Sequence, residues 1–170
     1  MEQVNLAPQP LGASKSSVEE YAKKVIDQLG YKKGEDLDKI LEELGGKTFT
    51  IPPDDLDQTP SMVVDGENSF IINLPLYSNY LRNRFTIAHE IGHYLLHSKQ
   101  GQIPIEVRRS GDNERVEWEA NWFAAAFLMS KNEIEKDWNE NGIRDIYTLA
   151  SIYQVSIEAM QIRLTALGLV

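Results

Sequence analysis

The sequence predicts an α+β domain, in which a small, mainly antiparallel sheet packs on a metal-binding helix and a helical C-terminal part follows. Two observations lead to this class. Asp65-Gly66 lies between the apolar runs 62–64 and 70–72, which is a strong hairpin signal. Downstream, apolar residues recur at helical spacing from Tyr80 to His97 and again from Glu114 to Met129.

Composition limits the classes of protein that the chain can be. Its 170 residues suit one compact domain, and 42% hydrophobic residues are enough to build a core. The net charge of −9 argues against direct nucleic-acid binding, which needs clustered Lys and Arg. There is no cysteine, so a metal ion has to be held by His, Asp or Glu. No apolar stretch reaches ~18 residues and no signal peptide is visible, so we expect a cytoplasmic protein with no membrane contact.

The chain divides into three predicted parts. Residues 1–14 carry no periodic pattern and are expected to form a flexible N-terminal arm. Residues 15–142 form the core domain, which begins with helices over 18–29 and 36–44 and a strand over 47–51. Residues 143–170 are expected to form a pair of helices that packs on this core.

The stretch from Ser98 to Asn113 is the longest without a clear element. Its short apolar piece at 103–107 lies between turn-forming residues. Arg108-Arg109 is the only basic pair in this stretch, and a solvated turn is the preferred interpretation over a substrate contact. A helix is predicted next at 114–129, and its apolar second half indicates that it is buried.

The central helix carries the pattern His-Glu-x-x-His. His89 and His93 are one helical turn apart, so both imidazoles project from one face and can bind one zinc ion. Glu90 lies beside them, where a carboxylate can act on a water molecule. All three histidines of the chain lie between residues 89 and 97, which argues against their being isolated structural histidines.

A catalytic zinc site needs a third protein ligand. One known spacing requires Gly at 96 and His at 99, but the chain has Leu96 and Lys99. His97 lies about 80° from His89 around the helix, so it is expected to support the site or cap the helix rather than to bind the metal.

A carboxylate from the next helix is the remaining option for the third ligand. Glu117 and Asn121 share one face of that helix, which continues into apolar sequence. We expect Glu117 to bind zinc and Asn121 to hold a histidine N–H behind the ligands. Glu119 is the rival ligand and is expected to face outward.

With these ligands, Glu90 is expected to be the catalytic general base. A donor for the developing oxyanion is also expected. The candidates for oxyanion or substrate contact near the motif are Tyr77, Tyr80, Arg82 and Arg84, together with Tyr94, and the sequence does not select among them.

Two segments together resemble the ImmA/IrrE family of zinc metallopeptidases. The first is Arg-Phe-Thr-Ile-Ala-His-Glu-Ile-Gly-His-Tyr-Leu-Leu-His at 84–97, and the second is Glu-Trp-Glu-Ala-Asn-Trp-Phe-Ala-Ala-Ala-Phe-Leu-Met at 117–129. The likeness covers roughly residues 18–168. Ser130 stands where the family usually has proline, at a helix boundary.

The resemblance implies a zincin-like, single-domain α+β fold with one zinc ion on His89, His93 and Glu117. It also implies a site-specific endopeptidase that cleaves a helix-turn-helix transcriptional repressor or antitoxin-like partner and so derepresses stress-response or mobile-element genes. The alternative is a protein-binding member of a toxin–antitoxin pair with little or no turnover, and the intact Glu90 counts against it. Residues 149–156 resemble part of a helix-turn-helix, but Arg163 is the only basic residue between 145 and 170.

Overall fold

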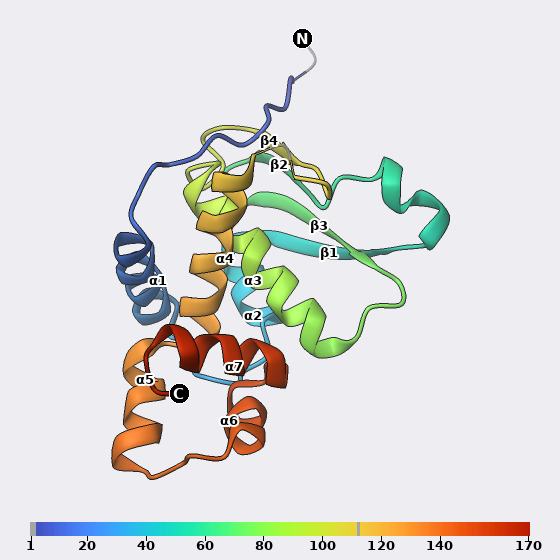
Figure 1. Cartoon of the computed structure of the whole chain (residues 1–170). Coiled ribbons are helices and arrows are strands. Elements are labelled where there is room, and N and C mark those ends of the chain that lie inside the picture. Colours follow the sequence, from blue (N-terminus) through green and yellow to red (C-terminus); the bar gives the residue numbers. More distant parts are fainter. Residues whose placement is uncertain (1–2, 112) are drawn as a thin grey trace.

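A computed structural model describes residues 3–111 and 113–170, so residues 1–2 of the predicted arm and residue 112 of the predicted loop lie outside the described residues. The predicted α+β class and zincin-like arrangement are confirmed. One four-stranded sheet lies beside a set of packed helices (Figure 1).

The sheet has the strand order β1-β3-β2-β4. The predicted hairpin is present as β2 (Met62–Gly66) and β3 (Ser69–Pro75), which pair antiparallel. β1 (Gly46–Ile51) pairs parallel with β3, and β4 (Ile105–Val107) pairs antiparallel with β2. Two of the three pairings are antiparallel, as predicted, whereas the sequence did not identify the apolar piece at 105–107 as a strand.

Helices cover the sheet in successive layers. α3 (Tyr80–Leu96) packs against β3 and against α4 (Glu114–Leu128), and α4 packs in turn against α1 (Lys15–Leu29). α2 (Asp38–Leu44) contacts β1 at the edge of the sheet. A short 3₁₀ helix, η1 (Pro53–Gln58), occupies most of the predicted loop at 54–60. In the part of the chain that is described, no helix is both long and apolar enough to cross a membrane.

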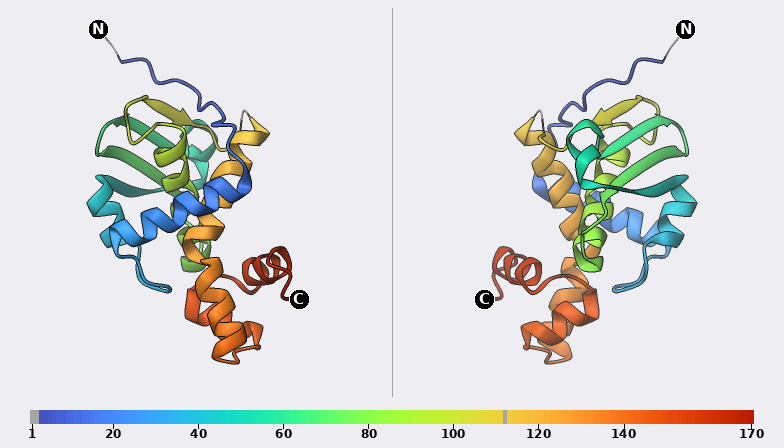
Figure 2. Two further views of the ribbon diagram at one scale, coloured as in Figure 1. Left: turned by 90° about the vertical axis from the view of Figure 1, so that its left-hand side faces the viewer. Right: turned by 90° about the vertical axis from the view of Figure 1, so that its right-hand side faces the viewer.

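The C-terminal helices gather at the end of α4 that points away from the sheet (Figure 2). α5 (Lys131–Glu135) continues into a π-helical turn, η2 (Lys136–Glu140), and α6 (Ile146–Tyr153) and α7 (Ile157–Ala166) follow. Leu149, Tyr153, Met160 and Leu164 are buried in the same apolar cluster as Phe127 of α4. The last helices therefore share the core of the domain.

The N-terminal segment makes specific contacts, which corrects the prediction of a flexible arm. Leu6 forms a parallel bridge with Ile105, so the segment lies along β4 at the edge of the sheet. Further along, the backbone N–H groups of Leu11 and Gly12 each donate to the carboxylate of Glu119 at 2.8 Å. The segment is ordered by contacts with β4 and α4 rather than by a helix or strand of its own, so its sequence shows no periodic pattern of apolar residues.

A buried carboxylate ties the C-terminal helices to the connection between α1 and α2. Asp137 accepts hydrogen bonds from Lys33 Nζ at 2.7 Å, from Tyr153 Oη at 2.7 Å and from Asn141 Nδ2 at 2.8 Å. Burial acts to raise the pKa of Asp137, but these three donors outweigh it, so the pKa is lowered. The ionised form is therefore favoured in the folded state.

We predict that Asp137→Ala lowers the free energy of unfolding at pH 7 by about 2–3 kcal/mol, since it leaves buried donors unpaired. Because the pKa of Asp137 is lower in the folded protein than in the unfolded chain, where it is about 3.9, its ionisation stabilises the fold at pH values above about 3.9. This contribution is lost as the pH falls through the folded-state pKa. Urea denaturation should therefore show a smaller difference between variant and parent near pH 3. The exposed Asp57 provides the control, and Asp57→Ala should cost less than about 0.5 kcal/mol.

Candidate metal centre

α3 presents the His-Glu-x-x-His residues to the interior of the domain. The helix starts at Asn79, whose side-chain oxygen accepts from the backbone N–H of Arg82 at 2.8 Å. One turn separates His89 from His93, and the two Nε2 atoms lie 3.1 Å apart. The His93 side chain is fully buried, whereas 15% of the His89 side chain is exposed.

α4 brings Glu117 to the same point. Its Oε2 lies 3.1 Å from His89 Nε2, and its Oε1 lies 3.2 Å from His93 Nε2. These three side chains are a group that can hold a metal ion. In a tetrahedral zinc site with bonds of about 2.0–2.2 Å, adjacent ligand atoms are about 3.3–3.5 Å apart. The observed separations are close to this spacing, so the three donors fit a zinc ion.

α3 and α4 approach each other closely because the residue of α3 that faces α4 is a glycine, Gly92. A Cβ atom on Gly92 would lie 3.2 Å from the carbonyl oxygen of Ala120 and 3.2 Å from Phe123 Cβ. Ala120 and Phe123 are completely buried on α4. The absence of a side chain at position 92 therefore sets the distance at which Glu117 meets the two histidines.

The protonation states suit metal binding, which requires neutral imidazoles and an ionised carboxylate. Burial lowers the pKa of His93 to about 4. Burial acts to raise the pKa of Glu117, but its contacts with the rings of His89 and His93 outweigh this effect, so the pKa is lowered. For His89 the lowering effect of burial is outweighed by Glu117 and Glu90, and its pKa is raised. A dication bound at this point would lower the pKa of His89 again, because its positive charge disfavours the protonated imidazole.

The structure brings Asn121 behind His89, where the sequence predicts it. Asn121 Oδ1 lies 2.8 Å from His89 Nδ1. Since the amide oxygen can only accept, His89 Nδ1 carries the proton and its Nε2 keeps a free lone pair. His97 lies behind His93 in the same way, with 2.9 Å between the two Nδ1 atoms.

The prediction that Glu119 faces outward is wrong. Its side chain is fully buried, and its Oε1 lies 3.0 Å from His97 Nε2. The N-terminal segment covers this side of α4, and Leu11 and Gly12 donate to the carboxylate from there. Glu119 is also not a rival metal ligand, because it contacts His97 rather than the group formed by His89, His93 and Glu117.

Glu90 lies in a buried environment beside the histidines, and only 3% of the residue is exposed. Burial raises its pKa to about 7, although the charge of His89 and a hydrogen bond from Ser61 act to lower it. Its Oε2 is buried without a hydrogen-bond partner among the described residues. A buried carboxylate oxygen without a partner is costly, which is typical of a group that acts on a ligand.

The structure does not support Arg84 as an oxyanion or substrate contact. Arg84 is 2% exposed, and its guanidinium donates to the carbonyl oxygens of Gln154 and Glu35 and to Tyr31 Oη. It lies five residues before His89, which places it about 140° away around α3. It therefore joins the helix to the C-terminal part and has a structural role.

The other candidates near the motif have different surroundings. Tyr80 is half exposed, and its hydroxyl is 3.4 Å from Asp36 Oδ2. Tyr77 is 83% exposed. Tyr94 is buried and hydrogen-bonded to the backbone of Asn68 and Gln100. The residues that chiefly change the pKa of Glu90 are His89, Ser61, Glu117 and Arg109, and they include none of these three tyrosines.

Arg109 is a residue of the centre that the sequence did not identify, since a solvated turn was preferred for it. Its guanidinium donates to the carbonyl oxygen of Asn73 at 2.6 Å, at the end of β3. The charges of Arg109 and Glu90 act on each other: each favours the ionised form of the other. Only the fold brings the loop of Arg109 over α3, so spacing along the chain gives no signal for it.

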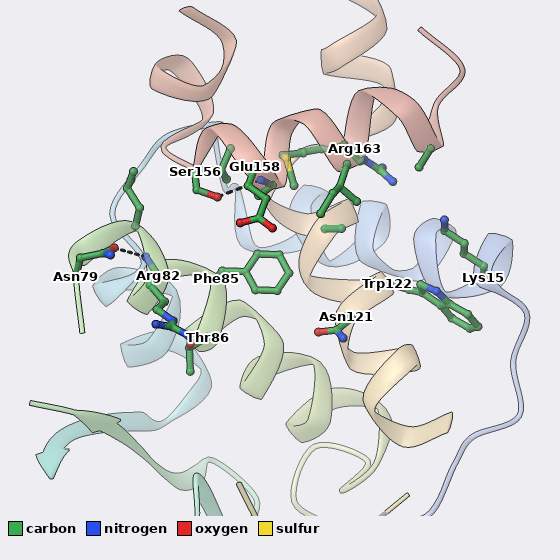
Figure 3. A pocket seen from close by; sticks show the side chains of 17 residues that line it. Lys15, Asn79, Arg82, Phe85, Thr86, Asn121, Trp122, Ser156, Glu158 and Arg163 are labelled. Atoms are coloured by element: carbon green, nitrogen blue, oxygen red, sulfur yellow. Dashed lines mark hydrogen bonds between the residues drawn. The ribbon is translucent and has the colours of Figure 1, made fainter. Parts of the chain in front are cut away.

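A groove of about 850 Å³, with a largely apolar lining, lies between α3, α4 and the C-terminal helices. Its walls are α3, α4 and α7, and Figure 3 shows Phe85 pointing into its middle and Arg82 and Thr86 at one side. Asn121, the partner of His89, lines the groove at its end nearest the metal centre. Arg82 thus lies in the groove wall, outside the group of three metal-binding side chains.

A comparison with protein families identifies the domain. The family model Peptidase_M78, described as an IrrE N-terminal-like domain, matches residues 54–165, which is about two thirds of the chain. The match includes both α3 and α4, and so every member of the metal-binding group. No curated protein matches the chain.

We predict that Gly92→Val moves α3 and α4 apart, because the new side chain meets the backbone of Ala120. The free energy of unfolding should fall by about 1–3 kcal/mol, as for other overpacked cores, and the affinity for zinc should fall with it. Urea denaturation and zinc titration against a competing chelator measure the two effects. Gly66→Val is the control, since a Cβ on Gly66 meets no atom within 4 Å; unchanged zinc affinity in Gly92→Val would contradict the assignment.

Proposed function

The chain belongs to the Peptidase_M78 family, and we propose that it is a zinc-dependent endopeptidase whose metal ligands are His89, His93 and Glu117. The observation that carries this proposal is the convergence of three donors, 3.1–3.2 Å apart, next to a buried carboxylate with an unpartnered oxygen. When bound there, zinc supplies a Lewis acid that polarises the scissile carbonyl and makes water more acidic.

Glu90 is the proposed general base. Its carboxylate takes a proton from water as the water oxygen attacks the carbonyl carbon, and it passes that proton to the nitrogen of the leaving amine when the C–N bond breaks. A pKa of about 7 allows the group both to accept and to release the proton near neutral pH. Arg109 keeps part of the Glu90 population ionised by its positive charge.

We further propose that the substrate is a helix-turn-helix transcriptional repressor or antitoxin-like protein, whose cleavage derepresses stress-response or mobile-element genes. The support is the resemblance of residues 84–97 and 117–129 to the ImmA/IrrE family together with the family match. A repressor substrate also implies that the enzyme acts in the cytoplasm. Residues 145–170 supply no surface cation for binding DNA directly, since Arg163 is buried.

We predict that Glu90→Gln leaves one zinc ion bound per chain and lowers the cleavage rate about 10²–10⁴-fold, because the amide cannot accept the proton. The substrate to use is the purified product of an adjacent repressor gene, with fragments identified by mass spectrometry and zinc measured by elemental analysis. A chelator should abolish cleavage by the parent enzyme, and zinc should restore it.

The same variant separates the peptidase from a protein-binding function without turnover. If Glu90→Gln and the parent cleave the repressor equally, or if both only bind it, the endopeptidase assignment is wrong. Asp57→Ala, at an exposed position away from the centre, is the control and should cleave like the parent.

A further inference from the structure

A chain of buried polar groups extends from the metal-binding histidine to the N-terminal segment. His93 Nδ1 lies 2.9 Å from His97 Nδ1, and His97 Nε2 lies 3.0 Å from Glu119 Oε1. The side chains of all three residues are 0% exposed. The backbone N–H groups of Leu11 and Gly12 also donate to the carboxylate, and Arg115 Nε lies 3.4 Å from its Oε2. Water therefore has no access to these bonds, and their donors and acceptors are determined by the groups themselves.

The direction of each bond follows from the chemistry of Glu119. An ionised carboxylate can only accept, so His97 donates from Nε2. A neutral imidazole that donates from Nε2 accepts at Nδ1, so the proton between the two histidines belongs to His93 Nδ1. His93 Nε2 then carries a lone pair and points to the metal-binding group, where its distance to Glu117 is 3.2 Å.

We propose that Glu119 and His97 are positioning residues that hold His93 in the tautomer whose Nε2 is free to bind the metal. Asn121 performs the same task for His89, so each histidine ligand has its own partner. Such partners fix the ring orientation and tautomer, and their loss typically weakens metal binding about 10- to 100-fold. The N-terminal segment contributes to the metal centre through its two hydrogen bonds to Glu119.

The test is the zinc affinity of His97→Phe and His97→Asn, measured by competition with a chelator. His97→Phe removes the acceptor for His93, so zinc binding should weaken by about 10- to 100-fold. His97→Asn keeps an acceptor at the position of Nδ1 and should recover part of the affinity. Tyr153→Phe, which removes a buried hydrogen bond to Asp137 far from the centre, is the control for lost stability and should bind zinc like the parent.

A spectroscopic measurement decides the point without any variant. Long-range ¹H–¹⁵N correlations of the zinc-free parent should show the proton of His93 on Nδ1 and that of His97 on Nε2. The opposite tautomer on His93, or zinc affinity of His97→Phe within twofold of the parent, would overturn the proposal. Because neither measurement uses peptide cleavage, a failure here is distinct from a failure of the endopeptidase assignment.

The apolar groove described above is a separate feature, and its meaning rests on the proposed function. We infer that it holds a segment of the substrate polypeptide that carries large apolar side chains. The groove borders the metal centre, since Asn121 both lines it and contacts His89. Its lining includes Leu81, Phe85, Trp122 and Ile162, and 63% of Ile162 is exposed. Pockets of this size and apolar character are typical of ligand sites.

α7 offers a matched pair of positions for testing the groove. Ile162 lines it, whereas Ile157 is 46% exposed on the same helix and does not. The probe is a peptide selected from a random phage-displayed library on zinc-loaded Glu90→Gln protein, then synthesised with a fluorophore. A glutamate in the groove places a charge against apolar groups, so Ile162→Glu should weaken peptide binding about tenfold or more. Ile157→Glu should leave the affinity within about twofold.

Equal affinity for both variants, or a library that yields no binding peptide, would overturn the assignment of the groove to the substrate. Binding is measured on a protein that lacks the general base, so the result is independent of catalysis. If peptides bind in the groove but the parent cleaves no protein, the endopeptidase assignment fails, and the groove is a peptide-binding site rather than a substrate site.

Discussion

The close approach of α3 and α4 at Gly92 is the constraint on which the metal centre depends. Two of the three donors come from α3 and the third from α4, so no single element contains the site. A methyl group at Gly92 would lie 3.2 Å from the Ala120 carbonyl oxygen and from Phe123, so these neighbours would have to shift by a few tenths of an ångström. Helix packing therefore sets the spacing of the three metal-binding side chains, so the apolar residues around them help to determine the geometry of the site.

Local patterns were sufficient to predict most of the fold and half of the centre. The positions of His89, Glu90 and His93 follow from one helical turn, and the hairpin follows from Asp65-Gly66. Glu117 was predicted because a polar face on an apolar helix needs a partner. The structure brings His89, His93 and Glu117 together as expected, because each inference used residues within one or two elements, where spacing determines geometry.

The errors share one physical cause, which is contact between segments far apart in the chain. The position of Glu119 on the helix, away from the face of Glu117 and Asn121, predicts an outward side chain, but the N-terminal segment covers that side of α4. The same two hydrogen bonds correct this prediction and that of a flexible arm. The sequence favours a solvated turn for Arg108-Arg109, because the electrostatic effect of Arg109 on Glu90, nineteen residues away in the sequence, arises only in the folded chain. The parallel pairing of β1 with β3 is likewise a property of the assembled sheet.

The electrostatics of the centre explain why so many polar groups tolerate burial together. The negative charge of Glu117 disfavours the ionised form of Glu90 and so contributes, after burial, to the raised pKa of Glu90. A dication between Glu117 and the histidines would reverse the sign of the local field and lower that pKa, so the base would be ionised when the metal is present. Metal binding would therefore be coupled to the ionisation of Glu90, the general base of the proposed mechanism. The neutral His93, held from behind by His97, adds no positive charge to oppose the ion.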